Sequence, residues 1–177
     1  MEPSYKNLLI KIKAFVFDVD GVLTDGTVIV NTEGQLLRNM NIKDGFALKT
    51  AIGKGYPICI ISGGTNPGVK KRLEGLGLND IYLGANHKMD LLKDFMSKYN
   101  LNPESLCYMG DDLPDYQVMS KVCLPCCPQD AVPEIKSIAK YISHRSGGGG
   151  CVRDIIEQVL KSQNNWFSGG SVSGHEN

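Results

Sequence analysis

One stretch near the start of the chain limits what the protein can fold into. Residues 11–25 form an apolar run that ends in carboxylates and a glycine, Lys-Ile-Lys-Ala-Phe-Val-Phe-Asp-Val-Asp-Gly-Val-Leu-Thr-Asp. Ile12 and residues 14–17 lack the alternation of a half-exposed strand, so they predict a strand buried on both faces, as in a parallel α/β sheet. Asp18 and Asp20 follow at the strand end, where such sheets bind ligands. Two acids placed there would repel each other unless a cation or a shared proton relieves them, so the stretch predicts a site.

The length and charge of the chain limit its organisation and its partners. The 177 residues, 42% of them hydrophobic, suffice for one full core and are too few for two ordinary domains. We expect a single domain over 1–167 and a flexible polar tail over 168–177. Nineteen basic residues balance nineteen acidic ones, without a basic run, so no nucleic acid and no membrane is expected as a partner. Without an apolar span or a signal-peptide pattern, we expect a cytoplasmic protein.

Six cysteines raise the question of disulfides or zinc. Several lie in apolar, strand-like runs of a chain that has no export signal, so we interpret them as reduced thiols of the core. The cluster at 123–127 lacks the second paired set that a structural zinc site usually needs. The six are Cys59, Cys107, Cys123, Cys126, Cys127 and Cys151.

The order of the remaining elements is typical of an α/β sheet. Residues 27–30 and 35–42 flank a turn whose Gly34 can adopt positive φ, which predicts a β-hairpin over 27–42. Asp44 is the expected N-cap of a short helix over 45–53. We expect residues 147–150, four glycines, to form a flexible joint. Further strands are expected at 56–61, 81–83, 105–110, 122–124 and 141–142, and further helices after Asn66 and over 87–99, 131–139 and 152–161.

Two more strand ends carry candidate phosphate ligands. Ser62, followed by Gly63 and Gly64, ends the strand at 56–61 and precedes a helix with Asn66 as N-cap and Pro67 at N1. The amides of that helix start suit a phosphate, although small residues that merely turn the chain explain the pattern too. Lys88 falls in a first helical turn, where a cation opposes the macrodipole. Its ammonium therefore either points to solvent or is held by an anion.

The strand at 105–110 repeats the signature of the first strand. Asp111 follows it directly, as Asp18 follows residues 14–17. Asp112 and Asp115 are explained as acids that complement the dipole of the next helix. Three strand-end carboxylates favour a hard cation, and all-oxygen ligation indicates Mg²⁺ rather than zinc. With Ser62 and Lys88 as phosphate partners, the predicted chemistry is phosphoryl transfer.

These residues resemble the haloacid dehalogenase superfamily of phosphatases, whose four motifs they match in order: Asp18-Val-Asp20-Gly21, Ser62, Lys88 and Gly110-Asp111-Asp112-Leu-Pro-Asp115. By this resemblance, Asp18 would be a nucleophile that forms an aspartyl phosphate. Asp20 would protonate the leaving alkoxide and then take a proton from water. Asp111, the Asp18 carboxylate and the Asp20 carbonyl would hold Mg²⁺, while Ser62 and Lys88 would bind the phosphoryl oxygens.

The spacing of the motifs leaves no room for a cap domain. Only 25 residues separate Ser62 from Lys88. The segment between the Asp18-Val-Asp20-Gly21 motif and Ser62 holds only the expected hairpin, a short helix and the strand at 56–61. Water must be excluded by another element, and a neighbouring subunit's hairpin is the available candidate. Its apolar residues predict an interface; they are Val28, Val30, Leu36 and Met40. The alternative is a monomer whose own residues 147–150 fold over the crevice.

The capless chain is similar to 3-deoxy-D-manno-octulosonate 8-phosphate phosphatases in residues 18–26, 41–45 and 151–154. The resemblance implies a Rossmann-like parallel sheet flanked by helices, with a small hairpin after the first strand. It also implies a homotetramer whose hairpins cover neighbouring sites, and a sugar-acid phosphate from lipopolysaccharide synthesis as substrate. The residues implied in substrate binding are Asp20, Asn41, Lys43, Asp44, Gly45, Lys49, Gly63, Gly64, Arg72 and Lys88.

Two other functions stay open at this point. Gly64 stands where many relatives have Arg and where relatives acting on nine-carbon sugar acids have Glu, so a nine-carbon sugar-acid phosphate or another small phosphate is an alternative substrate. A receiver-type signalling module also combines Asp, Ser or Thr and Lys around Mg²⁺. Such a module normally carries its phosphoacceptor on the third strand, whereas residues 81–84 carry none.

Overall fold

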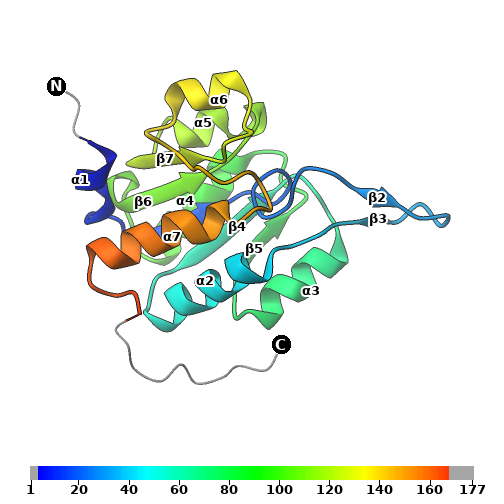
Figure 1. The fold of residues 1–177 in the computed structure, drawn as a ribbon, viewed down its shortest axis with the longest axis horizontal. Coiled ribbons are helices and arrows are strands. Elements are labelled where there is room, and N and C mark those ends of the chain that lie inside the picture. The colour runs from blue at the N-terminus through cyan, green and yellow to red at the C-terminus, as the bar shows by residue number, and fades with distance from the viewer. Residues whose placement is uncertain (1–3, 168–177) are drawn as a thin grey trace.

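The structure, a computed structural model, describes residues 4–167 and is built on one sheet of six parallel strands (Figure 1). The spatial order is β5-β4-β1-β6-β7-β8. In chain order this reads 3-2-1-4-5-6, which is the Rossmann order and confirms the predicted fold class. A receiver has the order 2-1-3-4-5, so that alternative is wrong. The strands are β1 (Ala14–Phe17), β4 (Ile58–Ser62), β5 (Asp80–Leu83), β6 (Leu106–Met109), β7 (Leu124–Cys127) and β8 (Tyr141–Ile142).

Helices cover both faces of the sheet. One face packs against α1 (Tyr5–Leu9), α2 (Ile42–Gly53), α3 (Pro67–Gly75) and α7 (Cys151–Ser162). The other packs against α4 (Lys88–Lys98), α5 (Tyr116–Met119) and α6 (Pro133–Ile138), and the 3₁₀ turns η1 (Pro103–Ser105) and η2 (Leu113–Asp115) flank β6. None of the helices described in residues 4–167 is both long and apolar enough to cross a bilayer.

Strand β1 lies in the middle of the sheet, and this position explains its unbroken apolar sequence. Phe15 and Phe17 point into one apolar core, while Ala14 and Val16 point into the other. All four are fully buried, which is why the run shows no alternation. Its neighbours are β4 and β6, so the strand order reverses between β1 and β6. The carboxyl ends at such a reversal form the ligand crevice of an open α/β sheet.

The hairpin predicted over 27–42 is present as β2 (Ile29–Val30) and β3 (Leu36–Leu37), which pair antiparallel. It projects away from the sheet (Figure 1). Its large apolar side chains stay exposed in the single chain; they are Val28, Ile29, Val30, Leu36 and Leu37. Between β1 and α2 the hairpin is the sole inserted element of the described chain, so the absence of a cap domain is confirmed.

Two elements differ from the sequence-based prediction. The strand expected at 122–124 lies at β7, because the chain pairs with β6 through Leu124, Pro125 and Cys126. Pro125 lacks a donor, but its carbonyl accepts from Lys140 N at 2.9 Å, so the ladder continues. Helix α1 was not predicted, since five residues carry too little periodicity. The other expected strands and helices occur near their expected positions, but the second hairpin strand, expected over 35–42, covers only Leu36–Leu37. All six cysteines are buried and free. The tail expected over 168–177 lies outside the described residues.

The predicted N-cap of α2 is wrong, and the residue concerned caps another helix. Asn41 caps α2 by accepting from Lys43 N at 2.8 Å. Asp44 lies in the first turn with 1% of its surface exposed, and its Oδ1 accepts from Arg153 N at 2.7 Å. Arg153 lies in the first turn of α7, whose own N-cap is glycine and has no side chain to offer. Asp44 therefore caps α7, which runs beside α2 (Figure 1).

Residues 147–150 do not form the expected flexible joint. Gly148 N donates to Val22 O at 3.0 Å, and Asn41 Nδ2 donates to Gly148 O at 2.9 Å. A methyl group on Gly147 would lie 2.0 Å from the carbonyl oxygen of Gly21. The segment is therefore packed against the loop that follows β1 and ties this loop to α2.

Gly147→Ala should destabilise the protein, because the new methyl group has no space beside Gly21. Overpacking of this kind typically costs about 1–3 kcal/mol, which a thermal or urea unfolding curve resolves. Gly75→Ala is the matched control: its Cβ would meet nothing within 4 Å and it ends α3, so we expect no loss of stability. Equal stability of the two variants would contradict the tight packing of residues 147–150.

Candidate active site

The carboxyl ends of β1, β4 and β6 open into one cleft of about 580 Å³. The structure brings together at this cleft residues that the sequence distributes over four motifs, because parallel strands end at the same edge of the sheet. The residues expected from the sequence that line the cleft are Asp18, Asp20, Ser62, Gly63, Gly64, Lys88 and Asp111.

Lys88 is held by two anions and does not point to solvent. Its Nζ lies 3.1 Å from Asp18 Oδ2 and 2.7 Å from Asp115 Oδ1, and only 7% of its side chain is exposed. Burial alone would lower the pKa of Lys88, but the Asp18 and Asp115 carboxylates outweigh burial and raise it. The ammonium therefore stays charged at the floor of the cleft.

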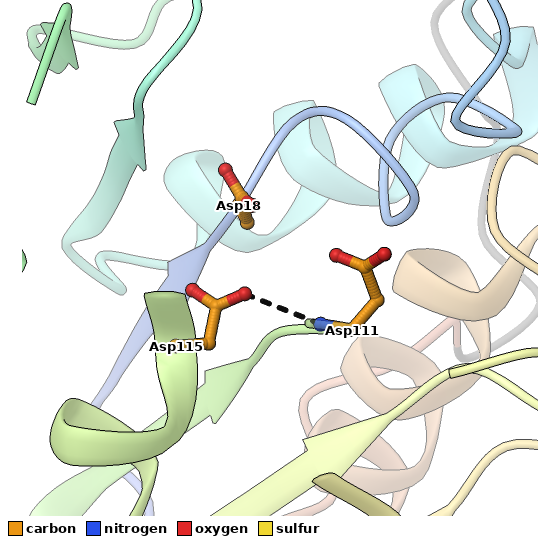
Figure 2. A group of neighbouring side chains, drawn as sticks. All are labelled: Asp18, Asp111 and Asp115. Atoms are coloured by element: carbon orange, nitrogen blue, oxygen red, sulfur yellow. Dashed lines mark hydrogen bonds between the residues drawn. The ribbon is translucent and has the colours of Figure 1, made fainter. Parts of the chain in front are cut away.

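Asp115 does more than complement a helix dipole, which is the only role predicted for it from the sequence. It is fully buried and accepts from Tyr108 OH at 2.6 Å and from Lys88 Nζ. It also accepts from Asp111 N at 3.3 Å (Figure 2). Its motif mate Asp112 is exposed and accepts from Leu113 N, as expected of a cap. The available signal for Asp115 was its place one turn after Asp111 in the same motif. Its contacts orient both Lys88 and the Asp111 backbone.

Three carboxylates converge at the cleft floor. Oxygens of Asp18, Asp111 and Asp115 lie within 4.8 Å of one another (Figure 2). Burial, reinforced by the facing carboxylates, raises the pKa of Asp18 to about 6 and that of Asp111 to about 7. Within the described chain, Asp111 Oδ1 is buried and has no hydrogen-bond partner. In residues 4–167 these acids form ion pairs with one ammonium, that of Lys88, so the arrangement fits a hard divalent cation such as Mg²⁺.

The three carboxylates of the cluster are not equally available to such a cation. Asp115 Oδ1 already accepts from two donors, Tyr108 OH and Lys88 Nζ, and its Oδ2 accepts from Asp111 N, whereas each oxygen of Asp18 has one partner. Asp18, and Asp111 with its unpartnered Oδ1, therefore keep the most lone pairs for a cation. The side chain of Asp20 points to another partner: Arg38 Nε lies 2.6 Å from its Oδ1, and Arg38 Nη2 lies 3.1 Å from its Oδ2. Ligation through the Asp20 carbonyl stays a prediction. No sequence pattern pointed to Arg38.

Six residues expected around the substrate lie outside this cleft in the single chain. For Asp44 and Gly45 the expectation is wrong, because both are buried between helices: Asp44 caps α7, and a methyl group on Gly45 would lie 3.1 Å from Arg72 Nη2 of α3. The first turn of α2 is thus directed towards its helical neighbours. The other four are Asn41, Lys43, Lys49 and Arg72. The cleft is completed by residues to which the sequence assigned no part in the site, Gly26, Ala85, Asn86, His87, Met89, Asp112, Pro114, Gln117 and Val118.

The raised pKa values of Asp18 and Asp111 predict how Mg²⁺ and pH affect stability. Without metal, both carboxyls bind a proton more tightly folded than unfolded. Their contribution is therefore fully present below about pH 4 and is lost as the pH rises through 6 to 7. Because Mg²⁺ competes with these protons, excess Mg²⁺ should raise Tm by several degrees at about pH 8 and by much less at about pH 5.

Thermal melts at both pH values, with and without Mg²⁺, measure this difference. Asp111→Asn should remove it, whereas Asp94→Asn, an exposed acid of α4, should leave it unchanged. An equal Mg²⁺ effect at both pH values would contradict ligation by the two acids.

Comparison with known proteins shows which family this chain resembles. A family model of haloacid dehalogenase-like hydrolases matches residues 80–154. The 3-deoxy-D-manno-octulosonate 8-phosphate phosphatase of Salmonella typhi is 35% identical over 152 residues, which cover 86% of this chain and 81% of that protein.

Solved structures of phosphatases of the same name also superpose well on this chain. The phosphatase of the same name from Yersinia pestis superposes with a TM-score of 0.90 at 28% identity, covering 93% of this chain and 89% of its own. That from Moraxella catarrhalis, solved with a magnesium ion, a phosphate ion and KDO, gives 0.87 at 31% identity, covering 90% and 92%. With its Rossmann-order sheet, its acidic cleft and this similarity over most of its length, the chain belongs to the 3-deoxy-D-manno-octulosonate 8-phosphate phosphatases, a family of haloacid dehalogenase-like hydrolases.

Proposed function

We propose that this protein is a Mg²⁺-dependent phosphatase that hydrolyses 3-deoxy-D-manno-octulosonate 8-phosphate to the free sugar acid and phosphate, in lipopolysaccharide synthesis. The observation that carries the proposal is the contact of Lys88 with Asp18 in a cleft that also holds Asp111. A carboxylate can attack a phosphate dianion only where cations neutralise both anions. The names of the relatives supply the substrate.

The nucleophile in this proposal is Asp18. Its Oδ1 accepts from Val19 N at 2.7 Å, and its Oδ2 faces Lys88, so the carboxylate is fixed from two sides. Asp18 attacks phosphorus, the bond from phosphorus to the sugar oxygen breaks, and an aspartyl phosphate forms. Lys88 and Ser62, both buried at the cleft floor, bind the phosphoryl oxygens. Asp18, Asp111 and the Asp20 carbonyl would hold Mg²⁺, which neutralises charge on those oxygens.

Asp20 acts as general acid and then as general base in this proposal. Its acid form gives a proton to the leaving sugar oxygen as that bond breaks, and its carboxylate then takes a proton from the water that attacks the aspartyl phosphate. Hydrolysis releases inorganic phosphate and restores Asp18. Asp20 suits this role because it lines the cleft beside Asp18 and is still 37% exposed.

Asp18→Asn should abolish turnover, because an amide cannot replace the attacking carboxylate. We expect kcat to fall on the order of 10⁴-fold or more, as for removal of other covalent nucleophiles. The measurement is phosphate release from 3-deoxy-D-manno-octulosonate 8-phosphate, with Asp94→Asn as the control for the same chemical change on an exposed surface. Retained turnover, beyond what amide hydrolysis regenerates, would rule out covalent catalysis by Asp18.

A nine-carbon sugar-acid 9-phosphate is the second candidate substrate. Position 64 carries no side chain, so neither an Arg nor a Glu is present there to select the distal part of the sugar. Relative kcat/KM values for the eight- and nine-carbon esters and for other small phosphates decide between the two.

We also propose that the enzyme is a cytoplasmic homotetramer with shared sites. The exposed apolar side chains of the hairpin support an interface, and so do Leu113 and Tyr116, which are exposed beside the cleft-lining Pro114 and Gln117. A hairpin from a second copy lying on this rim would exclude water from the cleft. Residues 147–150, the alternative cover, do not line it. Six buried, free cysteines support a reducing compartment.

Leu36→Asp should reduce assembly and turnover together, because a charge on the hairpin opposes burial in an interface. Light scattering gives the mass and phosphate release gives kcat. Ile10→Asp, which changes an apolar residue outside the hairpin that is even more exposed than Leu36, should affect neither. A wild-type enzyme that is fully active as a monomer at assay concentration would contradict the shared site.

A further inference from the structure

Arg38 is directed inward from an otherwise exposed hairpin. Only 8% of its side chain is exposed, while its neighbours Leu36 and Leu37 are open to solvent. The guanidinium donates to both oxygens of Asp20, through Nε at 2.6 Å and Nη2 at 3.1 Å. A two-point contact of this kind fixes the plane of a carboxylate as well as its position. Within residues 4–167, no other side chain forms a hydrogen bond or an ion pair with Asp20.

The backbone that carries Arg38 is itself held by the wall of the cleft. Arg38 Nη1 donates to Leu36 O at 3.2 Å, and Asn66 Nδ2 donates to the same carbonyl. Asn66 is the N-cap of α3 and accepts from Val69 N. The position of the guanidinium is therefore tied to the loop that follows Ser62, the last residue of β4.

Gly64 provides the space for this contact. A methyl group there would lie 3.1 Å from Asp20 Oδ2 and 3.5 Å from Arg38 Nη2. A larger side chain would displace the pair, so the glycine and the arginine fit each other.

We propose that Arg38 is a positioning residue for proton transfer by Asp20, an inference that rests on the proposed function. Each carboxylate oxygen has two lone pairs, and the guanidinium uses one of them on each oxygen. The other stays available to carry the proton that passes to the sugar oxygen as the ester bond breaks. Arg38 keeps its own protons throughout. Because Arg38 belongs to the hairpin, the orientation of the Asp20 carboxyl group depends on the position of the hairpin.

The test compares two esters that differ in their need for an acid. The alkoxide leaving from 3-deoxy-D-manno-octulosonate 8-phosphate needs a proton, whereas p-nitrophenolate leaves without one. The ratio kcat/KM reports only steps up to departure of the leaving group. General acid help is worth about 10²–10⁴-fold, so loss of its positioning in Arg38→Ala should lower kcat/KM for the sugar ester about 10- to 100-fold. For p-nitrophenyl phosphate the change should stay within about 3-fold.

Further variants separate positioning from a merely structural role. In the Asp20→Asn background, Arg38→Ala should cost nothing more with the sugar ester, because the group it positions is already removed. Arg38→Lys should fall between wild type and Arg38→Ala, since an ammonium supplies charge without the fork. Lys93→Ala, which removes an exposed cation of α4, is the matched control and should change neither ester.

Three outcomes would overturn the proposal. Equal losses with both esters would mean that the hairpin or the assembly was damaged, which light scattering and a thermal melt also reveal. Additive effects in the double variant would mean that Arg38 does not act through Asp20. Wild-type values for Arg38→Lys would mean that charge alone suffices.

The substrate assignment fails separately. If wild type turns over another alkyl phosphate but not the sugar-acid ester, the substrate is wrong, and the Arg38 comparison is made with that alkyl phosphate instead. If wild type hydrolyses no phosphate ester at all, the proposed function and the inference on Arg38 are both rejected.

Discussion

Repulsion among Asp18, Asp111 and Asp115 is the constraint on which the site depends. Their oxygens lie within 4.8 Å of one another, and among the described residues only Lys88 forms an ion pair with them. This repulsion helps to raise the pKa values of Asp18 and Asp111. Without a bound cation, ionising the two carboxyls would therefore lower the stability of the fold above neutral pH. Such a cluster of acids is typical of a functional site, where a bound divalent cation compensates the repulsion and a phosphate then binds to the cation.

The parts that hold these acids come from distant segments of the chain. Asp18 and Asp111 are fixed by adjacent strands at the centre of the sheet. The loop after β1 has no regular structure of its own, and residues 147–150 support it from the other end of the sequence. Asn41 and Asp44 connect this support to helices α2 and α7. A perturbation at the start of α7 is therefore expected to reach the loop that carries Asp20.

The two proposals for the hairpin concern different faces of the same small element. In the proposed assembly its exposed apolar side chains would provide a surface for a second copy, and its inward residue Arg38 contacts Asp20, the proposed acid–base carboxylate. A two-stranded hairpin is marginally stable alone. The bonds from Asn66 and Arg38 to Leu36 O, together with the pair to Asp20, give it fixed contacts with the cleft. Water exclusion and proton transfer would thus depend on the same small element.

The sequence by itself determined the sheet and the catalytic edge. An unbroken apolar run can only be buried on both faces, and acids that follow such runs must meet at one edge of a parallel sheet, so the motifs alone place Asp18, Ser62, Lys88 and Asp111 in one cleft. Tertiary structure decided what depends on contacts between distant segments. Asp44 caps α7 rather than its own helix, Asp115 orients Lys88, and Arg38 reaches Asp20 across 18 residues of chain. Local patterns carry periodicity and caps, but they do not encode which remote polar group completes a buried carboxylate, because that partner is fixed only when helices and loops pack together.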